Sequence, residues 1–362
     1  GLRRTALHEE HVRSGARLVP FAGFEMPVQY AGILKEHDAV RNRAGLFDLS
    51  HMGQVILEGT HVARWAETLT INAIESMKPM QARYNIFCNP QGGAHDDTIF
   101  YRLEGRWLLV VNGANAAKMW QHLNANLADG VKLQNLHGRN ALIAIQGPKS
   151  LEMLQPHIDV DLSSVKYYFC AEGKVYGRPA VIARTGYTGE DGFEIFCAGE
   201  HAPEIWAGLL RDNKDAGLEP CGLGSRDVLR LEAGMPLYGH ELTEEISPVQ
   251  AGLHWAIKTA KPEFIGRNSL IEQMDHNVYQ RIVGLIMEGR APAREGYPVF
   301  FNGRAAGTIR SGSMAPSVQN KNIATALVDH DAATEGTLLE VEIRGTKHQA
   351  TVVPLPFYKR QK

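Results

Sequence analysis

The sequence predicts an α+β fold that ends in a small all-β domain, and three observations lead to this prediction. The chain has 362 residues, which favours two to three domains at the usual size of about 100–200 residues each. Up to about residue 275, short apolar runs typical of strands alternate with apolar residues at helical spacing. Beyond that point only short strand-like runs remain, so we expect a β-barrel or β-sandwich there.

Strands and helices can be placed in turn along the first part of the chain. The strand-like runs lie at 55–59, 107–111, 141–145, 181–184 and 193–196. Thr60 can cap a first helix, and Pro148 suits the first helical turn after the run 141–145. A second helix is expected to start near Asn115, with an apolar stripe of Met119, Trp120, Leu123 and Leu127. A further helix contains Trp206; this residue, Trp65 and Trp120 lie on such stripes and are expected in the core.

The last part of the chain reads as strands alone. After a boundary near 261–273, the strand-like runs lie at 282–287, 299–301, 306–310, 323–328, 338–343 and 349–353. Asn302-Gly303 separates two of these runs and is a strong hairpin signal. This spacing of short strands and turns predicts the all-β C-terminal domain.

Composition and charge exclude several classes of protein. A net charge of −2 and a pI near 6.8 do not indicate a nucleic-acid or membrane-surface binder. The longest apolar runs, such as 107–111, are too short to cross a membrane. The amino terminus lacks the apolar core of a signal peptide. We therefore expect a bacterial-type cytoplasmic protein, with a mature mitochondrial matrix protein as the alternative.

The cysteines do not indicate a metal site or a redox motif. Four of them are widely spaced, with no Cys-x-x-Cys pair and no regular Cys/His spacing: Cys88, Cys170, Cys197 and Cys221. They are expected to be small core residues in a reducing compartment.

The densest group of residues that could carry chemistry is the run Gly92-Gly93-Ala94-His95-Asp96-Asp97. Glycine backbone lets a ligand approach closely, and a strand that follows would hold a carboxylate in one place. Because alternate side chains of a strand face opposite sides, Asp96 and Asp97 cannot both face one pocket. Taken alone, such a run is more often a solvated turn than a catalytic site.

Several common enzyme motifs are missing from the sequence. The segment Gly222-Leu223-Gly224-Ser225-Arg226 lacks the third glycine and the spacing of a dinucleotide fingerprint. The phosphate loop of ATPases and the Gly-x-Ser-x-Gly turn of hydrolases are also absent. An enzyme that uses nicotinamide, flavin or ATP through these motifs is therefore not expected.

Four other segments combine glycines with polar and aromatic residues: 21–30 (FAGFEMPVQY), 45–53 (GLFDLSHMG), 184–194 (RTGYTGEDGFE) and 224–239 (GSRDVLRLEAGMPLYG). Between and after them come Gln146-Gly147-Pro148, Phe264-Ile265-Gly266-Arg267 and Ser311-Gly312-Ser313. The ordered set resembles the glycine cleavage T-protein family, the aminomethyltransferases that use tetrahydrofolate. The resemblance runs nearly end to end, and it is specific because many separated motifs occur in the right order.

This resemblance implies a three-domain cloverleaf around a central folate channel, with two mixed α/β domains and a C-terminal all-β barrel. The first, folate-binding domain would be discontinuous and formed by residues 1–48 and 136–260. The second domain, residues 49–135, would be inserted into the first and would carry the catalytic acid. The barrel would span residues 275–362.

The resemblance also implies the site residues. Asp97 corresponds to the catalytic acid of the family, which leaves Asp96 at a turn or the surface and His95 as an ordinary turn residue. Glu194 corresponds to a carboxylate that accepts hydrogen bonds from the pterin, and Arg226 to a folate-contacting arginine. The further folate or substrate positions are Tyr84, Tyr187, Tyr101, Asn112, Met52, Tyr238 and Tyr358.

Some of these residues also have ordinary structural interpretations. Without the resemblance, Glu194 would be read as a solvated strand carboxylate, and Arg226 as the partner of Asp227 or Glu232 on its own helix. His95 and Thr98 replace the apolar residues that usually flank the acidic pair in the family. Both positions could change the pKa or the orientation of the acid.

The implied reaction moves the methylene carbon from the aminomethyl-dihydrolipoyl H-protein to tetrahydrofolate. The products are 5,10-methylenetetrahydrofolate, ammonia and the dihydrolipoyl H-protein. Asp97 is expected to orient folate near N10 and to assist proton transfer. Tetrahydrofolate is then an acceptor substrate and the lipoylated H-protein the partner, with no metal, flavin, nicotinamide, nucleic acid or membrane expected.

Two alternatives share the fold. One is a non-transferase folate-binding protein of the iron–sulfur assembly type, whose Lys-Gly-Cys-Tyr-x-Gly-Gln signature is replaced here by Met235-Pro236-Leu237-Tyr238-Gly239-His240. The other is a folate module related to sarcosine and dimethylglycine dehydrogenases, which occurs behind a flavin domain that this sequence does not contain. The transferase is favoured because Asp97 is present and both alternatives lack their own signals.

Overall fold

The computed structural model describes residues 1–362, and the chain divides into two compact units. The first unit contains residues 1–66, 74–84 and 98–227, and the second contains 67–73, 85–97 and 228–362. Four elements run across this division: β5 (Ala82–Cys88), β6 (Ala94–Leu103), α3 (Val62–Leu69) and α7 (Leu223–Glu232). None of the helices has both the length and the apolar character needed to span a membrane.

The first unit contains a six-stranded sheet with the order β10-β11-β12-β9-β3-β13. Its strands are β3 (Gly45–Asp48), β9 (Asn140–Gln146), β10 (Cys170–Val175), β11 (Arg178–Ala183), β12 (Gly192–Ala198) and β13 (Glu219–Cys221). All neighbours are antiparallel except β13, which pairs in parallel with β3. The strands expected at 141–145, 181–184 and 193–196 are thus confirmed as β9, β11 and β12.

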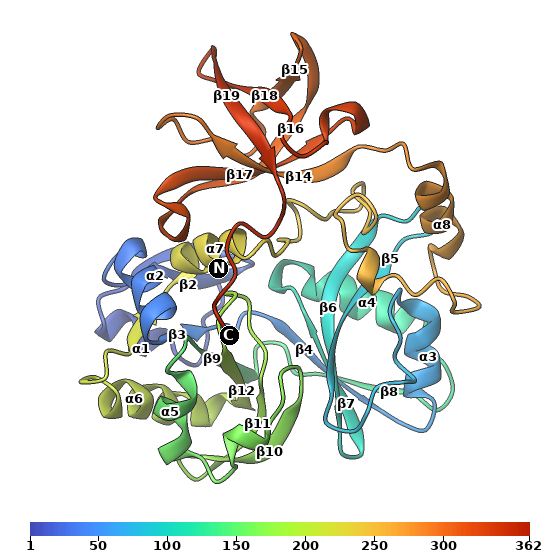
Figure 1. The fold of residues 1–362 in the computed structure, drawn as a ribbon. Coiled ribbons are helices and arrows are strands. Elements are labelled where there is room, and N and C mark those ends of the chain that lie inside the picture. The colour runs from blue at the N-terminus through green and yellow to red at the C-terminus, as the bar shows by residue number, and fades with distance from the viewer. The chain divides into compact units, whose positions relative to one another are not determined.

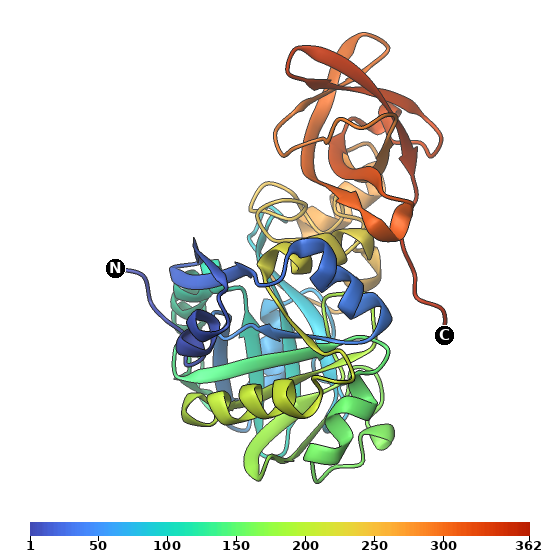
Figure 2. The same cartoon turned by 90° about the vertical axis from the view of Figure 1, so that its left-hand side faces the viewer.

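Helices pack on this sheet and form its hydrophobic core (Figure 2). The core joins Ile143 and Ile195 of the sheet to Ile205 and Trp206 of α6 (Ala202–Asp212), with further residues from α5 (Ser150–Leu154). Trp206 is completely buried, as its helical stripe predicts. A buried indole of this size makes one of the larger apolar contributions to such a core.

A five-stranded sheet follows the order β5-β6-β7-β4-β8 (Figure 1). Its remaining strands are β4 (Gly53–Glu58), β7 (Arg106–Val111) and β8 (Lys132–Asn135), and it is accompanied by α3 and by α4 (Ala116–Ala125). The expected stripe of α4 is partly wrong. The helix ends at Ala125, so Leu127 falls outside it and is 48% exposed. Trp65 is buried, as expected, whereas Trp120 is only half-buried.

Further elements lie outside these two sheets. The first residues form α1 (His8–Arg13), the antiparallel pair β1 (Arg17–Phe21) and β2 (Phe24–Gln29), and α2 (Ile33–Asn42). Short 3-10 helices occur at Gly113–Asn115, Gln155–His157, Leu162–Ser164, Gly199–His201, His254–Ala256, Pro316–Val318 and His330–Ala332. All four cysteines are free and buried, which confirms their assignment to the core.

The second unit contains a closed barrel with the order β14-β17-β16-β15-β18-β19, drawn in orange and red in Figure 1. The strands are β14 (Arg281–Met287), β15 (Pro298–Phe301), β16 (Arg304–Ala315), β17 (Lys321–Val328), β18 (Leu338–Ile343) and β19 (Thr346–Val353). Asn302 and Gly303, which join β15 to β16, both have positive φ, 50° and 80°, as the hairpin signal requires. The prediction of mixed α/β domains followed by an all-β barrel is confirmed.

A buried charge pair ties α7 to the barrel within the second unit. Arg230 donates to Glu241 at 2.6 Å and to Ser311 of β16 at 2.8 Å, and its side chain is 1% exposed. Glu241 also accepts from the hydroxyl of Thr325 on β17 at 3.2 Å. Such a pair can be buried because each charge is matched by an opposite charge and by further hydrogen bonds.

The second unit also contains α8 (Arg267–His276). The boundaries of the three domains and their arrangement around a central channel stay a prediction.

Candidate active site

The carboxylate expected to bind the pterin lies on β12, inside the first unit. Glu194 pairs with Ala183 of β11 and Ala144 of β9, so a strand on each side fixes its position. The residue is 7% exposed, and its carboxylate accepts a hydrogen bond from the Thr185 hydroxyl at 2.5 Å. Burial raises the pKa of Glu194, and the Thr185 hydrogen bond and the charge of Arg226 act in the opposite direction. Glu194 is therefore not a solvated strand carboxylate.

Arg226 and Tyr187 lie together in the same unit. The Arg226 guanidinium carbon is 4.6 Å from the centroid of the Tyr187 ring, within the range of a cation–π contact. Burial lowers the pKa of Arg226, while Tyr187 and the nearby Glu194 carboxylate favour its charged form. The structure thus brings three of the predicted folate residues into one cluster of opposite charges and an aromatic ring.

The loop that carries Tyr187 is held from both sides. The side chain of Gln146, at the end of β9, donates to the Thr185 carbonyl at 3.1 Å and accepts from the Thr188 hydroxyl at 2.9 Å. Arg41 of α2 donates to the Thr188 carbonyl at 2.5 Å and to Glu190 at 2.8 Å. Because these partners come from regular elements, the loop between β11 and β12 is presented as a fixed surface.

Tyr101 packs in the core beside this cluster. It is 1% exposed on β6, and its ring makes an edge-to-face contact with Phe196 at 5.2 Å. Burial raises the pKa of Tyr101 well above its ordinary value, and the charge of Glu194 adds to this effect. Tyr101 is therefore a buried, neutral phenol near Glu194, and its direct contact with folate stays a prediction.

The other predicted residues of the first unit are half-buried. Tyr84 lies on β5 and Met52 follows β3, where its backbone amide donates to the Leu49 carbonyl at 3.0 Å. Asn112 caps a short 3-10 helix through its carbonyl, which accepts from the Asn115 amide at 3.0 Å.

His51 is a residue of this unit that the sequence did not single out. It is 3% exposed, and its Nδ1 atom is buried with no hydrogen-bond partner. Burial and the charge of Arg226 lower the pKa of His51 to about 4. A buried polar atom without a partner is costly, which fits a place where a substrate supplies the missing contact. Its position next to Met52 in the segment 45–53 was the available signal.

The low pKa of His51 predicts a pH dependence of stability. The ordinary histidine value is 6.5, so between pH 6.5 and 4 the unfolded chain binds a proton that the folded protein excludes. The free energy of unfolding should therefore fall with decreasing pH in this window, by up to about 1.4 kcal/mol per pH unit from this residue. The free energy of unfolding of His51→Asn, measured with denaturant at several pH values in this window, should fall less steeply with decreasing pH than that of the native protein. His276→Asn, at an exposed histidine, is the control, and equal slopes for both variants would contradict the assignment.

The predicted acid lies on β6, in the part that belongs to the second unit. Along this strand Ala94, Asp96 and Thr98 are buried, whereas His95 and Asp97 are half-buried. Asp96 and Asp97 thus face opposite sides, as expected. The expectation for Asp96 is wrong, because it is 0% exposed within a strand rather than at a turn or the surface. The expectation for His95 is also wrong, because it lies in the strand and bonds Glu244 at 2.7 Å.

Tyr238 lies near Asp97 in the second unit. Its hydroxyl donates to the Ala94 carbonyl at 2.7 Å. Burial raises the pKa of Tyr238, and the carboxylates of Glu244, Asp96 and Asp97 add to the effect. Tyr358, the last predicted residue, is half-buried, and its backbone amide donates to the Glu232 carbonyl at 2.9 Å.

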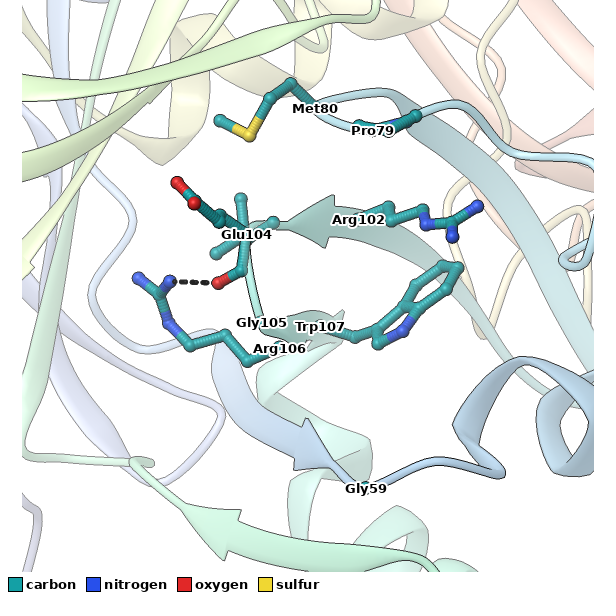
Figure 3. A pocket seen from close by; sticks show the side chains of 9 residues that line it. Gly59, Pro79, Met80, Arg102, Glu104, Gly105, Arg106 and Trp107 are labelled. Atoms are coloured by element: carbon teal, nitrogen blue, oxygen red, sulfur yellow. Dashed lines mark hydrogen bonds between the residues drawn. The ribbon is translucent and has the colours of Figure 1, made fainter.

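A separate cavity of about 590 Å³ opens in the first unit (Figure 3). It is lined by Gly59, Pro79, Met80, Arg102, Leu103, Glu104, Gly105, Arg106 and Trp107, none of which is a predicted site residue. Its two arginines already have protein partners, Arg102 at the Met77 carbonyl and Arg106 at Glu172. The cavity is therefore not the candidate site. No group of three or more His, Cys, Asp or Glu side chains is arranged to hold a metal ion.

Comparisons with known proteins cover the whole chain. Residues 7–261 match the family described as the GCVT N-terminal domain, and residues 280–359 match the glycine cleavage T-protein C-terminal barrel domain. An aminomethyltransferase of Moorella thermoacetica is 45% identical over 100% of this chain and 99% of its own. One of Geobacillus kaustophilus is 43% identical over 100% of both chains.

A solved structure agrees with these matches. The glycine cleavage system aminomethyltransferase T from Bartonella henselae superposes with a TM-score of 0.93 at 33% identity, over 99% of both chains. The sequence matches and this structural match span the same residues as the α/β domains and the barrel described above. The chain therefore belongs to the glycine cleavage T-protein family.

Proposed function

We propose that this chain is the aminomethyltransferase of a glycine cleavage system, with tetrahydrofolate as its acceptor substrate. The observation that carries the proposal is the full-length identity of 43–45% to proteins named aminomethyltransferase. The folate-binding role rests on the cluster in the first unit, where the buried carboxylate of Glu194 lies near the half-buried Arg226, whose guanidinium stacks on the Tyr187 ring.

The chemistry of this cluster suits a pterin. The edge of a pterin presents amino and ring N–H donors, which a carboxylate such as Glu194 can accept in pairs. Arg226 offers a planar set of donors for a carbonyl or carboxylate oxygen, and Tyr187 offers a ring face. Since Gln146 and Arg41 hold the loop of Tyr187, the cluster needs little rearrangement on binding.

The reaction balances without an oxidant or a reductant. The bonds of the aminomethyl carbon to sulfur and to the amino nitrogen break, and the carbon forms one bond each with N5 and N10 of tetrahydrofolate. The two protons released from these nitrogens are taken up by the departing ammonia and by the thiol of the dihydrolipoyl arm. In this proposal Asp97 orients folate and accepts the proton from N10, a role that typically contributes about 10²–10⁴-fold to a rate.

The donor in this proposal is the lipoylated H-protein. Its arm has to deliver the aminomethyl group, so the interaction is expected to be transient and to weaken with salt. The relatives named above are bacterial, which supports a cytoplasmic location as part of the proposal. Neither alternative with the same fold is favoured, because the full-length relatives carry the transferase name.

Glu194→Gln is expected to weaken folate binding about 10–100-fold. The amide keeps the size of the side chain but loses the charge and one of the two acceptor positions, and hydrogen bonds to charged groups are worth about 1.5–3 kcal/mol. Titration of tetrahydrofolate by calorimetry measures the change. Glu172→Gln, at a half-exposed carboxylate of the same unit, should bind like the native protein. If Glu194→Gln bound tetrahydrofolate as tightly as the native protein, Glu194 would not be part of the folate site.

The direct test of the function is the formation of 5,10-methylenetetrahydrofolate from aminomethyl-loaded lipoyl carrier and tetrahydrofolate. Repeated turnovers per enzyme molecule would support the transferase. Tight folate binding without product would instead support a folate-binding relative that is not a transferase.

A further inference from the structure

A tight turn leads into the strand that carries Asp97. The side-chain oxygen of Asn89 accepts from the backbone amides of Gln91 and Gly93, each at 3.0 Å, and the Asn89 amide donates to the Gly93 carbonyl at 2.8 Å. Gly92 has φ of +92°, a conformation that favours glycine. The backbone from Asn89 to Gly93 therefore forms a hydrogen-bonded turn just before β6.

Glu244 contacts this turn, although it is 155 residues from Asn89 in the sequence. The side-chain amide of Asn89 donates to Glu244 twice, to Oε2 at 2.9 Å and to the backbone carbonyl at 3.1 Å. A Cβ atom at Gly93 would collide with that same carbonyl oxygen. Only glycine permits this approach, so the turn and the segment around Glu244 are packed backbone to backbone.

The first residues of β6 are held by the same segment. The Ala94 amide donates to the Thr243 carbonyl at 2.8 Å, and the Ala94 carbonyl accepts from the Tyr238 hydroxyl at 2.7 Å. His95 Nδ1 bonds the second oxygen of Glu244, Oε1, at 2.7 Å. Both carboxylate oxygens of Glu244 are thus engaged, one with the turn and one with the strand.

His95 links these contacts to the acid. His95 and Asp97 are two positions apart, with Asp96 between them, so the two side chains lie on the same face of β6, about 7 Å apart along the strand. His95 and Asp97 are half-buried, in contrast to the buried Asp96 between them. A displacement of His95 or of the preceding turn would therefore rotate or shift the face that presents Asp97.

We propose that Glu244 is a positioning residue for Asp97, acting through His95 and the Asn89–Gly93 turn. This inference rests on the proposed function for its effect on turnover, but not for its effect on the strand. Glu244 fixes the direction of the Asp97 carboxylate without touching the substrate. Misplacing a reacting group by about 1 Å costs roughly 10²-fold in rate, so the loss of Glu244 should appear in kcat.

Glu244→Ala is expected to lower kcat about 10–100-fold and to change KM for tetrahydrofolate less than about twofold. Glu244→Gln should recover most of the rate, because its oxygen can accept from Asn89 and its amide can donate to a neutral His95. Glu245→Ala is the matched control. Glu245 is the exposed neighbour of Glu244, and none of the hydrogen bonds to the turn described above involves it.

A double-variant experiment separates positioning from general stability. In the Asp97→Asn background, adding Glu244→Ala should lower kcat by less than about twofold, because the group that Glu244 positions is already gone. The same additional loss in both backgrounds would overturn the inference. Asn89→Ala, which removes the turn side of the contact, should behave like Glu244→Ala and replaces it if that variant does not fold.

A readout without substrate distinguishes this inference from the proposed function. Hydrogen exchange of the backbone amides of residues 93–97 should be at least about tenfold faster in Glu244→Ala than in Glu245→Ala, because anchored amides exchange through local opening. Unchanged exchange would overturn the inference even in an active transferase. A native protein that lacks folate-dependent turnover would overturn the proposed function, and the exchange experiment would still decide the role of Glu244.

Discussion

Asp97→Asn is expected to lower turnover about 10²–10⁴-fold while leaving the affinity for tetrahydrofolate within a few-fold of native. The amide keeps the shape of the side chain but accepts a proton far less readily than a carboxylate, and a positioned acid or base contributes about this factor. Single-turnover ammonia release and a folate titration of the same variant measure the two effects separately. A loss confined to kcat identifies a group that acts on the reaction rather than on binding.

The control for this experiment is Glu245→Gln, which removes a negative charge from an exposed position of the same unit. Its turnover should equal that of the native protein. Asp96 is unsuitable as a control because it is completely buried, so its substitution would disturb the strand. Near-native turnover of Asp97→Asn would exclude the proposed role of this carboxylate.

Arg230→Met is expected to destabilise the second unit by about 3–5 kcal/mol, the cost of leaving one member of a buried ion pair without its partner. The substitution replaces the guanidinium-bearing side chain by an unbranched, uncharged one and leaves the Glu241 carboxylate buried beside Ser311. Urea unfolding followed by far-UV circular dichroism should show an earlier transition for the variant.

The matched control is the double variant Arg230→Met with Glu241→Leu. Replacing both members of a buried pair by apolar side chains is often close to neutral, so the double variant should recover most of the lost stability. If the free energy of unfolding of Arg230→Met lay within about 1 kcal/mol of the native value, this pair would not hold α7 to the barrel.

Local sequence patterns were sufficient to predict most of the regular structure. The barrel strands are short apolar runs separated by turns, and Asn302-Gly303 requires a conformation that only a few residues adopt readily. Helix ends were harder to place. Leu127 continues the apolar spacing of α4, but the helix ends two residues earlier at Ala125, because periodicity alone does not define a terminus.

The candidate site was predictable only where the strand rule or the family motifs applied. The alternation rule separates Asp96 from Asp97, yet it does not tell which face of the strand is buried. The bond from His95 to Glu244 spans 149 residues, and neither residue carries a local signal of the other. The same holds for the stacking of Arg226 on Tyr187, since contacts between distant segments depend on how the sheets and loops pack.

His51 illustrates a further limit of sequence reasoning. Its place beside Met52 in the segment 45–53 was a signal in the sequence, but the burial of His51 and its unpartnered Nδ1 appear only in the structure. Burial is a property of the whole fold rather than of the neighbouring residues, so the pKa shift that follows from it could not be anticipated.

The most direct test of the central claim is the rate of ammonia release from aminomethyl-loaded lipoyl carrier protein, measured with and without tetrahydrofolate. The transferase predicts fast release that requires folate, with stoichiometric formation of 5,10-methylenetetrahydrofolate. Equal rates with and without folate, in a protein that binds folate tightly, would contradict the claim and leave a folate-binding protein of the same fold.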